Sequence, residues 1–202
     1  MPIIKSLIVA AALVSGAPLL AQAAPLNVPA GEYALDKTHA SLTWQVNHLG
    51  LSNYTARFAS YDATINLNPA EPTKSSVTVT IDPRSVRTDF PFPEKEDFDA
   101  VIADRFLQAG AYPTITFQSS ALEATGAQTG RLTGNLTFLG VTRPVVLDVT
   151  LNAAKDHPMR KTPALGFSAT GTIKRSDFGS KELLGPVGDD IKLMIEAEFM
   201  KK

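Results

Sequence analysis

Three histidines and several carboxylates are the side chains of this sequence that could act as acids, bases or metal ligands. Asp36 and His39 lie three residues apart, so they could pair as a general base and its partner, although an aspartate before a strand more often caps a turn. His39 and His48 occupy opposite phases of one expected strand and should face opposite sides, which makes them a poor zinc pair. A hydrogen-bonded structural role is favoured for both, and His157 falls in a polar loop where solvation is expected.

The remaining charged groups form no catalytic or metal-binding motif. Asp97 and Asp99 would point to different sides of a helix, and Asp189-Asp190 without a patterned loop is a weak calcium signal. No nucleophile elbow, phosphate-binding loop or dinucleotide fingerprint is present. Five arginines lie at expected strand ends or turns: Arg57, Arg84, Arg87, Arg143 and Arg175. We favour a solvated surface position for each of them, and the alternative is that one or two bind a lipid diphosphate. We therefore predict no catalysis, no metal and no cofactor.

Composition excludes several classes of function. The chain has 202 residues, no cysteine and a net charge of −1. Thiol catalysis, iron–sulfur clusters and cysteine-type zinc sites are impossible, and the absence of a basic excess argues against nucleic acid as a partner.

The first 23 residues have the three-part plan of a secretory signal. A single early cation, Lys5, precedes the apolar run Leu7–Val14, and the small-residue end Ala21-Gln22-Ala23 is an A-x-A cleavage box. The apolar run is shorter than the about 20 residues that a membrane-spanning helix needs. We expect a signal peptide over residues 1–23, a mature single domain over residues 24–202, and a periplasmic location.

The mature chain is dominated by period-2 apolar patterns, which are typical of half-buried strands. In the stretch Tyr33–Ser52, apolar residues alternate with polar ones from Ala40 to Val46. The next strand changes phase, which predicts a bulge near Ala59–Ser60. Further alternating segments are expected at residues 77–81, 114–119, 121–124, 131–139, 145–151, 167–173 and 191–199, with Gly134 at a tight spot.

One segment has a helical pattern. Phe98, Val101, Ile102 and Phe106 recur at spacings of three and four, which predicts a helix over residues 94–109 or two shorter pieces. About eight amphipathic strands with tight turns make an all-β, antiparallel fold, which either closes as a barrel or packs as a sandwich.

Ordered sequence blocks across the mature chain resemble the YceI-like family of lipocalin-like, polyisoprenoid-binding periplasmic proteins. The blocks are Tyr33-x-Leu35-Asp36-x-x-His39, Trp44-x-Val46-x-His48-Leu49-Gly50-Leu51-Ser52, Tyr112-Pro113-Thr114-Ile115-Thr116-Phe117-x-Ser119, Gly134-Asn135-Leu136-Thr137 with Gly140-Val141-Thr142-Arg143-Pro144-Val145, Arg175-Ser176-Asp177-Phe178-Gly179, and Val187-Gly188-Asp189-Asp190. The segment Asp89–Glu96 departs from the Arg-Asp-x-His-Leu of many members, so no ligand role is carried over to it.

The resemblance implies an antiparallel, eight-stranded, lipocalin-like barrel with one inserted short helical segment, around a cavity that holds an isoprenoid or similar lipid. The apolar faces of the strands agree, because they carry large aromatic residues, although for each of these taken singly plain core packing is favoured over ligand contact. The residues that we predict to bind the ligand are Trp44, Val46, His48, Phe58, Phe117, Phe138, Phe167, Ile195 and Phe199.

Three hypotheses for function follow. The favoured one is a non-catalytic carrier or store of an isoprenoid-type lipid, whether a polyprenyl chain, a quinone-like molecule or a similar amphiphile. The second is an enzyme that acts on an isoprenoid diphosphate through Asp36 and His39. The third is a module that delivers a lipid to a membrane redox protein, and a homodimer is the candidate oligomeric state.

Overall fold

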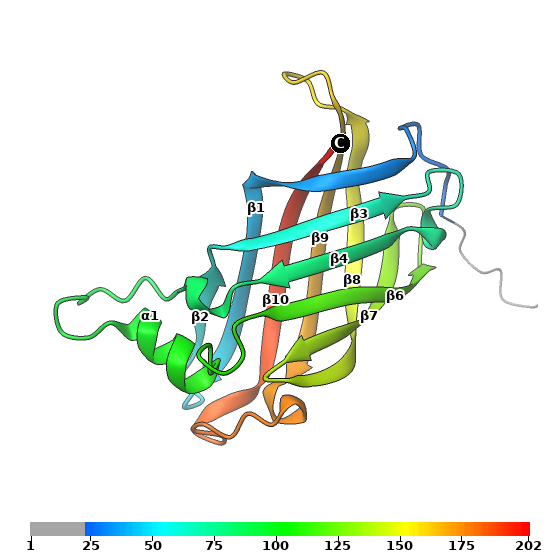
Figure 1. Cartoon of the computed structure of the whole chain (residues 1–202). Helices are drawn as coiled ribbons and strands as arrows, with labels where there is room; N and C mark the ends of the chain where they lie inside the picture. Colours follow the sequence, from blue (N-terminus) through cyan, green and yellow to red (C-terminus); the bar gives the residue numbers. More distant parts are fainter. Residues whose placement is uncertain (1–22) are drawn as a thin grey trace, which may run out of the picture.

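The computed structural model describes residues 23–202, and these residues form a closed, antiparallel β-barrel (Figure 1). The sheet runs in the order β10-β9-β8-β7-β6-β4-β3-β1, and β1 also pairs with β10, which closes a ring of eight strands. The predicted barrel is therefore confirmed over the sandwich. The predicted signal peptide lies outside the described residues except for Ala23.

Short connections join most of the strands, as expected for an antiparallel meander, and the longest one, residues 88–114 between β5 and β6, contains the helical segment. The strands are β1 (Gly31–His48), β2 (Ser52–Phe58), β3 (Tyr61–Leu67), β4 (Ser76–Ile81), β5 (Val86–Arg87), β6 (Ile115–Ala124), β7 (Thr129–Phe138), β8 (Val141–Asp156), β9 (Pro163–Lys174) and β10 (Val187–Lys201). The helical turns are η1 (Pro72–Lys74), η2 (Pro83–Ser85), α1 (Phe98–Val101), η3 (Ile102–Phe106) and η4 (Arg175–Phe178). Within residues 23–202, none of the helices has the length and apolar character needed to cross a bilayer.

Strand β1 bends and changes partner along its length. Its first residues, Gly31–Ala34, pair with β3, and Leu42–His48 pair with β2, while the register against β10 shifts between Leu35 and Ala40. The predicted irregularity at Ala59–Ser60 divides one expected strand into β2 and β3. Bulges and bends of this kind let a sheet curve until it closes.

One detail of the strand prediction was wrong, and one pair of alternatives for the helical segment is now decided. Residues 115–124 form the single strand β6 with a register shift between Ser119 and Ala121, instead of two separate strands. Of the two alternatives for residues 94–109, the structure has the two shorter pieces, α1 and the π-helix η3, within narrower bounds than predicted. Asp97 caps α1, because its carboxylate accepts a 3.0 Å hydrogen bond from the backbone N–H of Ala100, and residues 94–96 therefore lie outside the helix.

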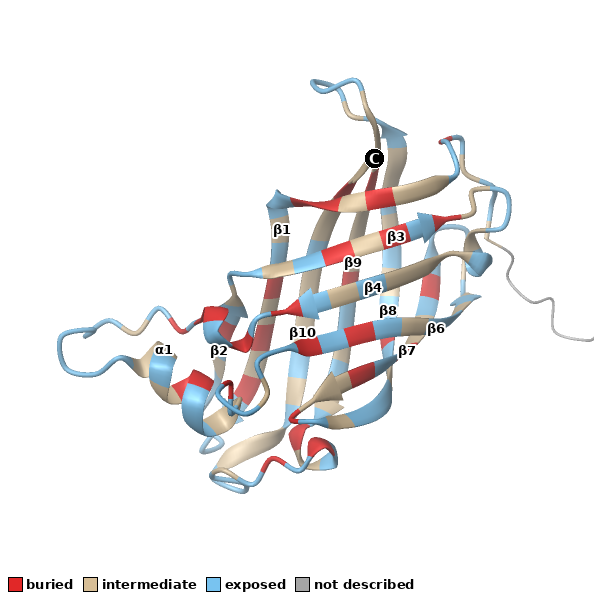
Figure 2. Cartoon of the chain, in the orientation of Figure 1, coloured by how far each residue is buried: buried red, intermediate tan, exposed pale blue. Residues whose placement is uncertain are grey.

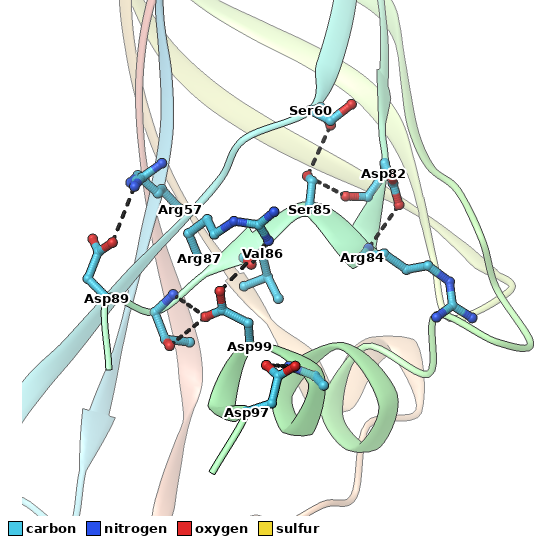
Figure 3. Close-up of polar contacts among 12 residues, drawn as sticks. Arg57, Ser60, Asp82, Arg84, Ser85, Val86, Arg87, Asp89, Asp97 and Asp99 are labelled. Atoms are coloured by element: carbon cyan, nitrogen blue, oxygen red, sulfur yellow. Dashed lines mark hydrogen bonds and ion pairs between the residues drawn. The ribbon is translucent and has the colours of Figure 1, made fainter. Parts of the chain in front are cut away.

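A polar network fixes the segment that leads into α1 (Figure 3). Asp99 accepts hydrogen bonds from the backbone N–H and the hydroxyl of Thr88, at 2.7 Å and 2.6 Å. The hydroxyl of Ser85 donates to the carbonyls of Ser60 and Asp82. These contacts hold α1 and η3 beside β2, where Figure 1 shows them at one end of the barrel.

Gly134 on β7 lies where no side chain fits, as the sequence predicted. A Cβ there would lie 2.3 Å from the ring of Phe117 and 2.7 Å from the carbonyl of Gln118. The missing side chain lets Phe117 of β6 pack across its neighbouring strand.

We predict that Gly134→Ala lowers the free energy of unfolding by about 1–3 kcal/mol, because Phe117 must leave its position in a packed wall. Urea denaturation measures the loss. Gly166→Ala is the matched control on β9, because a Cβ there would have its nearest neighbour at 3.8 Å. Equal stability of the two variants would contradict the packing argument.

Candidate functional site: the barrel cavity

A long cavity of about 760 Å³ runs inside the barrel. Its middle is lined by apolar side chains from β1, β3, β4 and β6 to β10. The volume lies within the about 300–1,000 Å³ of small-molecule sites. Several inward-facing side chains, such as Phe138, Phe167 and Ile195, are only half-buried because they face this space rather than other atoms.

All nine residues that the sequence analysis proposed for ligand contact line the cavity. Trp44, Val46, Phe117 and Phe199 are buried in its wall. His48 is exposed at the end of β1, and it lines the cavity in the same phase as Trp44. The structure thus brings these residues to one space, and their contact with a ligand stays a prediction.

Sequence reasoning missed part of the wall. The apolar face of the α1–η3 segment turns toward the cavity, so that Phe98 and Phe106 line it together with Phe90 and Tyr54. Phe90 packs against Phe98 with ring centroids 5.3 Å apart. The helical spacing of Phe98 and Phe106 was the available signal, but sequence could not tell on which surface that face would lie.

Polar residues line the cavity chiefly at its two ends. At the helical end, which comprises the β1–β2 turn, residues 89–112 and residues 179–186, the polar lining residues are His48, Glu96, Arg105, Arg175 and Ser180. At the other end they are Thr73, Ser75, Ser76, Gln128 and Thr129, from η1 and the β6–β7 turn. A hydrocarbon chain fits the middle, and a polar group fits either end.

Arg175 is buried rather than solvated, contrary to the expectation for the turn arginines. Its guanidinium donates to the backbone carbonyls of Glu182, Val187 and Gly188 at 2.6–2.8 Å. Burial lowers the pKa of Arg175, and the charges of Asp189 and Glu182 oppose that effect. The arginine therefore fixes the loop before β10, because its donors are used on backbone carbonyls.

Trp44 carries an unusual polar atom. Among residues 23–202, its indole Nε1 is the buried side-chain nitrogen or oxygen that has no hydrogen-bond partner. The indole lies in the wall of the cavity and packs with Ile102 and Ala103 of η3. A buried donor without a partner costs about 1–3 kcal/mol.

Asp36 and His39 lie at the bend of β1 and are absent from the residues that line the cavity. The Asp36 carboxylate accepts hydrogen bonds from Thr38 and contacts His39 Nδ1 at 3.0 Å and the Arg160 guanidinium at 2.7 Å. Hydrogen bonds from Thr38 and His39, with the charge of Arg160, hold the pKa of Asp36 well below its usual range. A carboxylate so fully bound and ionised is a weak general base.

The same corner contains a group of potential metal ligands. Asp36, His39 and Glu198 place one ligand atom each within 4.8 Å of one another. A cation there would compete with Arg160 for the Asp36 oxygen, so the geometry suits an ion pair better than a metal. Arg160 comes from the β8–β9 turn, where His157 Nδ1 accepts from the backbone N–H of Met159 and Arg160. His157 is thus a turn-stabilising residue rather than a merely solvated one.

Asp189 and Asp190 likewise have separate partners. Asp189 accepts from the backbone N–H and hydroxyl of Ser176, and Asp190 pairs with Lys174 at 2.8 Å. The weak calcium signal of the sequence is accounted for by these contacts.

Comparison with known proteins agrees with the fold and the sequence blocks. The profile of the YceI-like domain matches residues 33–199. The YceI protein of Salmonella arizonae is 35% identical over 175 residues, which cover 86% of this chain and 88% of that protein. The crystal structure of the Campylobacter jejuni YceI protein is 33% identical, covers 77% of this chain and 90% of its own, and superposes with a TM-score of 0.66.

A more distant match shares only the fold. A polyisoprenoid binding domain from Saccharophagus degradans, implicated in plant cell wall breakdown, is 15% identical and gives a TM-score of 0.58. The match covers 84% of this chain and 98% of that domain.

We predict that Asp36→Asn lowers the free energy of unfolding at neutral pH by about 1–3 kcal/mol, because the amide cannot satisfy His39 and Arg160 together. The pKa of Asp36 is lower in the folded chain than the about 3.9 of an unfolded aspartate. The stabilisation is therefore complete above about pH 4 and declines as the pH falls toward the folded-state value. Urea denaturation from pH 7 to pH 3 should show the difference between parent and variant shrinking.

Asp148→Asn, on an exposed position of β8, is the control and should follow the parent at every pH. A constant difference between Asp36→Asn and the parent across this range would contradict the assignment.

Proposed function

Since this chain belongs to the YceI-like domain family, we propose that it binds and carries an isoprenoid-type lipid without catalysing its conversion. The observation that supports the proposal is the apolar cavity of about 760 Å³ inside the closed barrel. Affinity would come from apolar area removed from water, at roughly 25 cal/mol per Å². An isoprenoid chain offers such area along its whole length.

The polar groups at the helical end supply a place for a head group. His48 and Arg105 reach the cavity there, so a carbonyl, hydroxyl or phosphate oxygen would find hydrogen-bond donors beside it. We infer that the ligand is an amphiphile whose chain fills the middle and whose head lies near His48. Quinone-like molecules and polyprenyl derivatives both meet this description.

The alternatives are less favoured. The enzymatic hypothesis needs Asp36 free to take a proton at a bound substrate, whereas Asp36 is ionised, fully hydrogen-bonded and outside the cavity wall. Delivery to a membrane redox protein and assembly as a homodimer stay predictions from the sequence.

We propose a periplasmic location, because the first 23 residues have the plan of a cleaved signal. When the full chain is expressed in a Gram-negative bacterium, we expect the protein in the periplasmic fraction with Ala24 as its first residue. Fractionation and N-terminal sequencing test this. Ala23→Phe should leave the longer precursor, because the cleavage box requires a small residue there. A cytoplasmic, uncleaved parent would contradict the proposal.

Trp44 is the single tryptophan of the chain and lines the cavity, so it reports on occupancy. We predict that delipidated protein binds a short-chain isoprenoid quinone with quenching of Trp44 fluorescence, and that the same quinone ring without its isoprenoid tail binds more weakly. Native mass spectrometry of protein from its own host should show a retained lipid.

Ala169→Phe places a ring inside the cavity and should weaken binding of the isoprenoid quinone at least about tenfold. The adjacent Thr170 is exposed on the outer face, so Thr170→Phe is the matched control and should bind as the parent does. Loss of affinity in both variants, or in neither, would contradict binding in the barrel.

A further inference from the structure

Exposed large apolar side chains are concentrated at the helical end of the barrel. The structure places seven such residues on the surface of residues 23–202, and five of them belong to this end: Leu49, Leu51, Phe92, Leu183 and Leu184. We call these five the rim. They come from three separate loops, which Figure 2 shows as largely exposed beside α1 and at the start of β10.

Specific hydrogen bonds fix the loops that carry the rim. The backbone N–H of Leu49 donates to the carbonyl of Pro186 at 2.9 Å, which ties the β1–β2 turn to the loop before β10. That loop is held from inside by the buried guanidinium of Arg175. Leu49 and Leu183 also have positive φ angles, of 56° and 46°, which are unfavourable for a residue with a Cβ. The fold thus holds two exposed leucines in a backbone conformation that disfavours a side chain.

The rim borders the cavity. Leu183 itself lines it, and His48, immediately before Leu49, does so as well. Glu96 and Arg105 line the same end from the side of α1 and η3. The rim therefore surrounds the place where we put the ligand's head group.

We propose that the rim docks on the surface of a lipid bilayer and that the ligand enters and leaves there, an inference that rests on the proposed function. A water-insoluble isoprenoid has the bilayer as its reservoir, so a carrier must bring the end of its cavity to that surface. Apolar side chains on separate loop tips can each enter the interface between head groups and acyl chains without a matching protein surface.

The charges at this end are of both signs, and much of the acidic charge is paired. Glu182 contacts Arg105, and Asp89 lies 3.2 Å from Arg57. Lys95 Nζ lies 4.2 Å from the centre of the Phe92 ring, so its charge can stay at the head groups while the ring enters the interface. Docking should therefore depend on apolar insertion and only slightly on anionic lipid.

The test is co-sedimentation of the mature chain with phosphatidylcholine vesicles, with and without phosphatidylglycerol. We expect the parent to bind both kinds of vesicle to a similar extent. The double variant Leu51→Asp/Leu184→Asp should partition at least about tenfold less, because it places two charges where apolar side chains insert. Both positions are exposed, so thermal unfolding of the variant should match that of the parent.

Met159→Asp is the matched control. Met159 is 82% exposed against 83% for Leu51, and it lies on the β8–β9 turn at the opposite end of the barrel (Figure 1). It should leave vesicle binding unchanged. Bilayer docking would be overturned if the control and the rim variant lost vesicle binding equally, or if the parent stayed in the supernatant. Sedimentation only with membranes that contain proteins would overturn it as well.

Two readouts separate this inference from the proposed function. The rim variant should still bind the isoprenoid quinone and quench Trp44, and Ala169→Phe should still sediment with vesicles. If the parent binds the quinone normally but does not sediment with vesicles, the docking proposal alone is overturned. If the parent sediments with vesicles but does not bind the quinone, the rim is still a membrane-binding surface, and the carrier function is overturned.

Discussion

Closure of the sheet is the constraint on which the structure depends. β1 pairs with β10 from Tyr33 to His48, so each strand of the ring has two neighbours. Eight strands set a circumference that leaves an interior, and the inward side chains decide how much of it stays empty. The lining includes small residues as well as aromatic ones, namely Ala63, Ala169, Ala197 and Gly130. The cavity results from that mixture, because a set of uniformly large residues would fill it.

The strands and their inward faces could be predicted because period 2 is a local property. Trp44, Phe117 and Phe199 were assigned to the apolar faces of their strands from alternation alone, and all three line the interior. The size of the cavity could not be predicted, since it depends on closure and on the volumes of residues far apart in the sequence. The barrel was predicted from the resemblance to a known family, because the strand pattern alone was also compatible with a sandwich.

The sequence was least informative for residues whose partners lie far away in the chain or are backbone groups. Apolar spacing predicted one helix over residues 94–109 or two shorter pieces, and the bounds of the two observed pieces are narrower because Asp97 caps α1 and Asp99 binds Thr88. Arg175 looked like a surface cation because its loop partners carry no sequence signal, being backbone carbonyls. The interaction of Asp36 with Arg160 joins residues that are far apart in the chain and meet only when β1 bends toward the β8–β9 turn.

The pairing of β1 with β10 also bears on how the chain acquires its structure. Tyr33 lies opposite Lys201, so the last contact of the ring joins the two extremes of the described chain. A nascent polypeptide lacks the β10 partner of β1 until β10 has been synthesised, and such long-range pairings form slowly. The ring can therefore close, and its cavity can form, only after β10 has been synthesised.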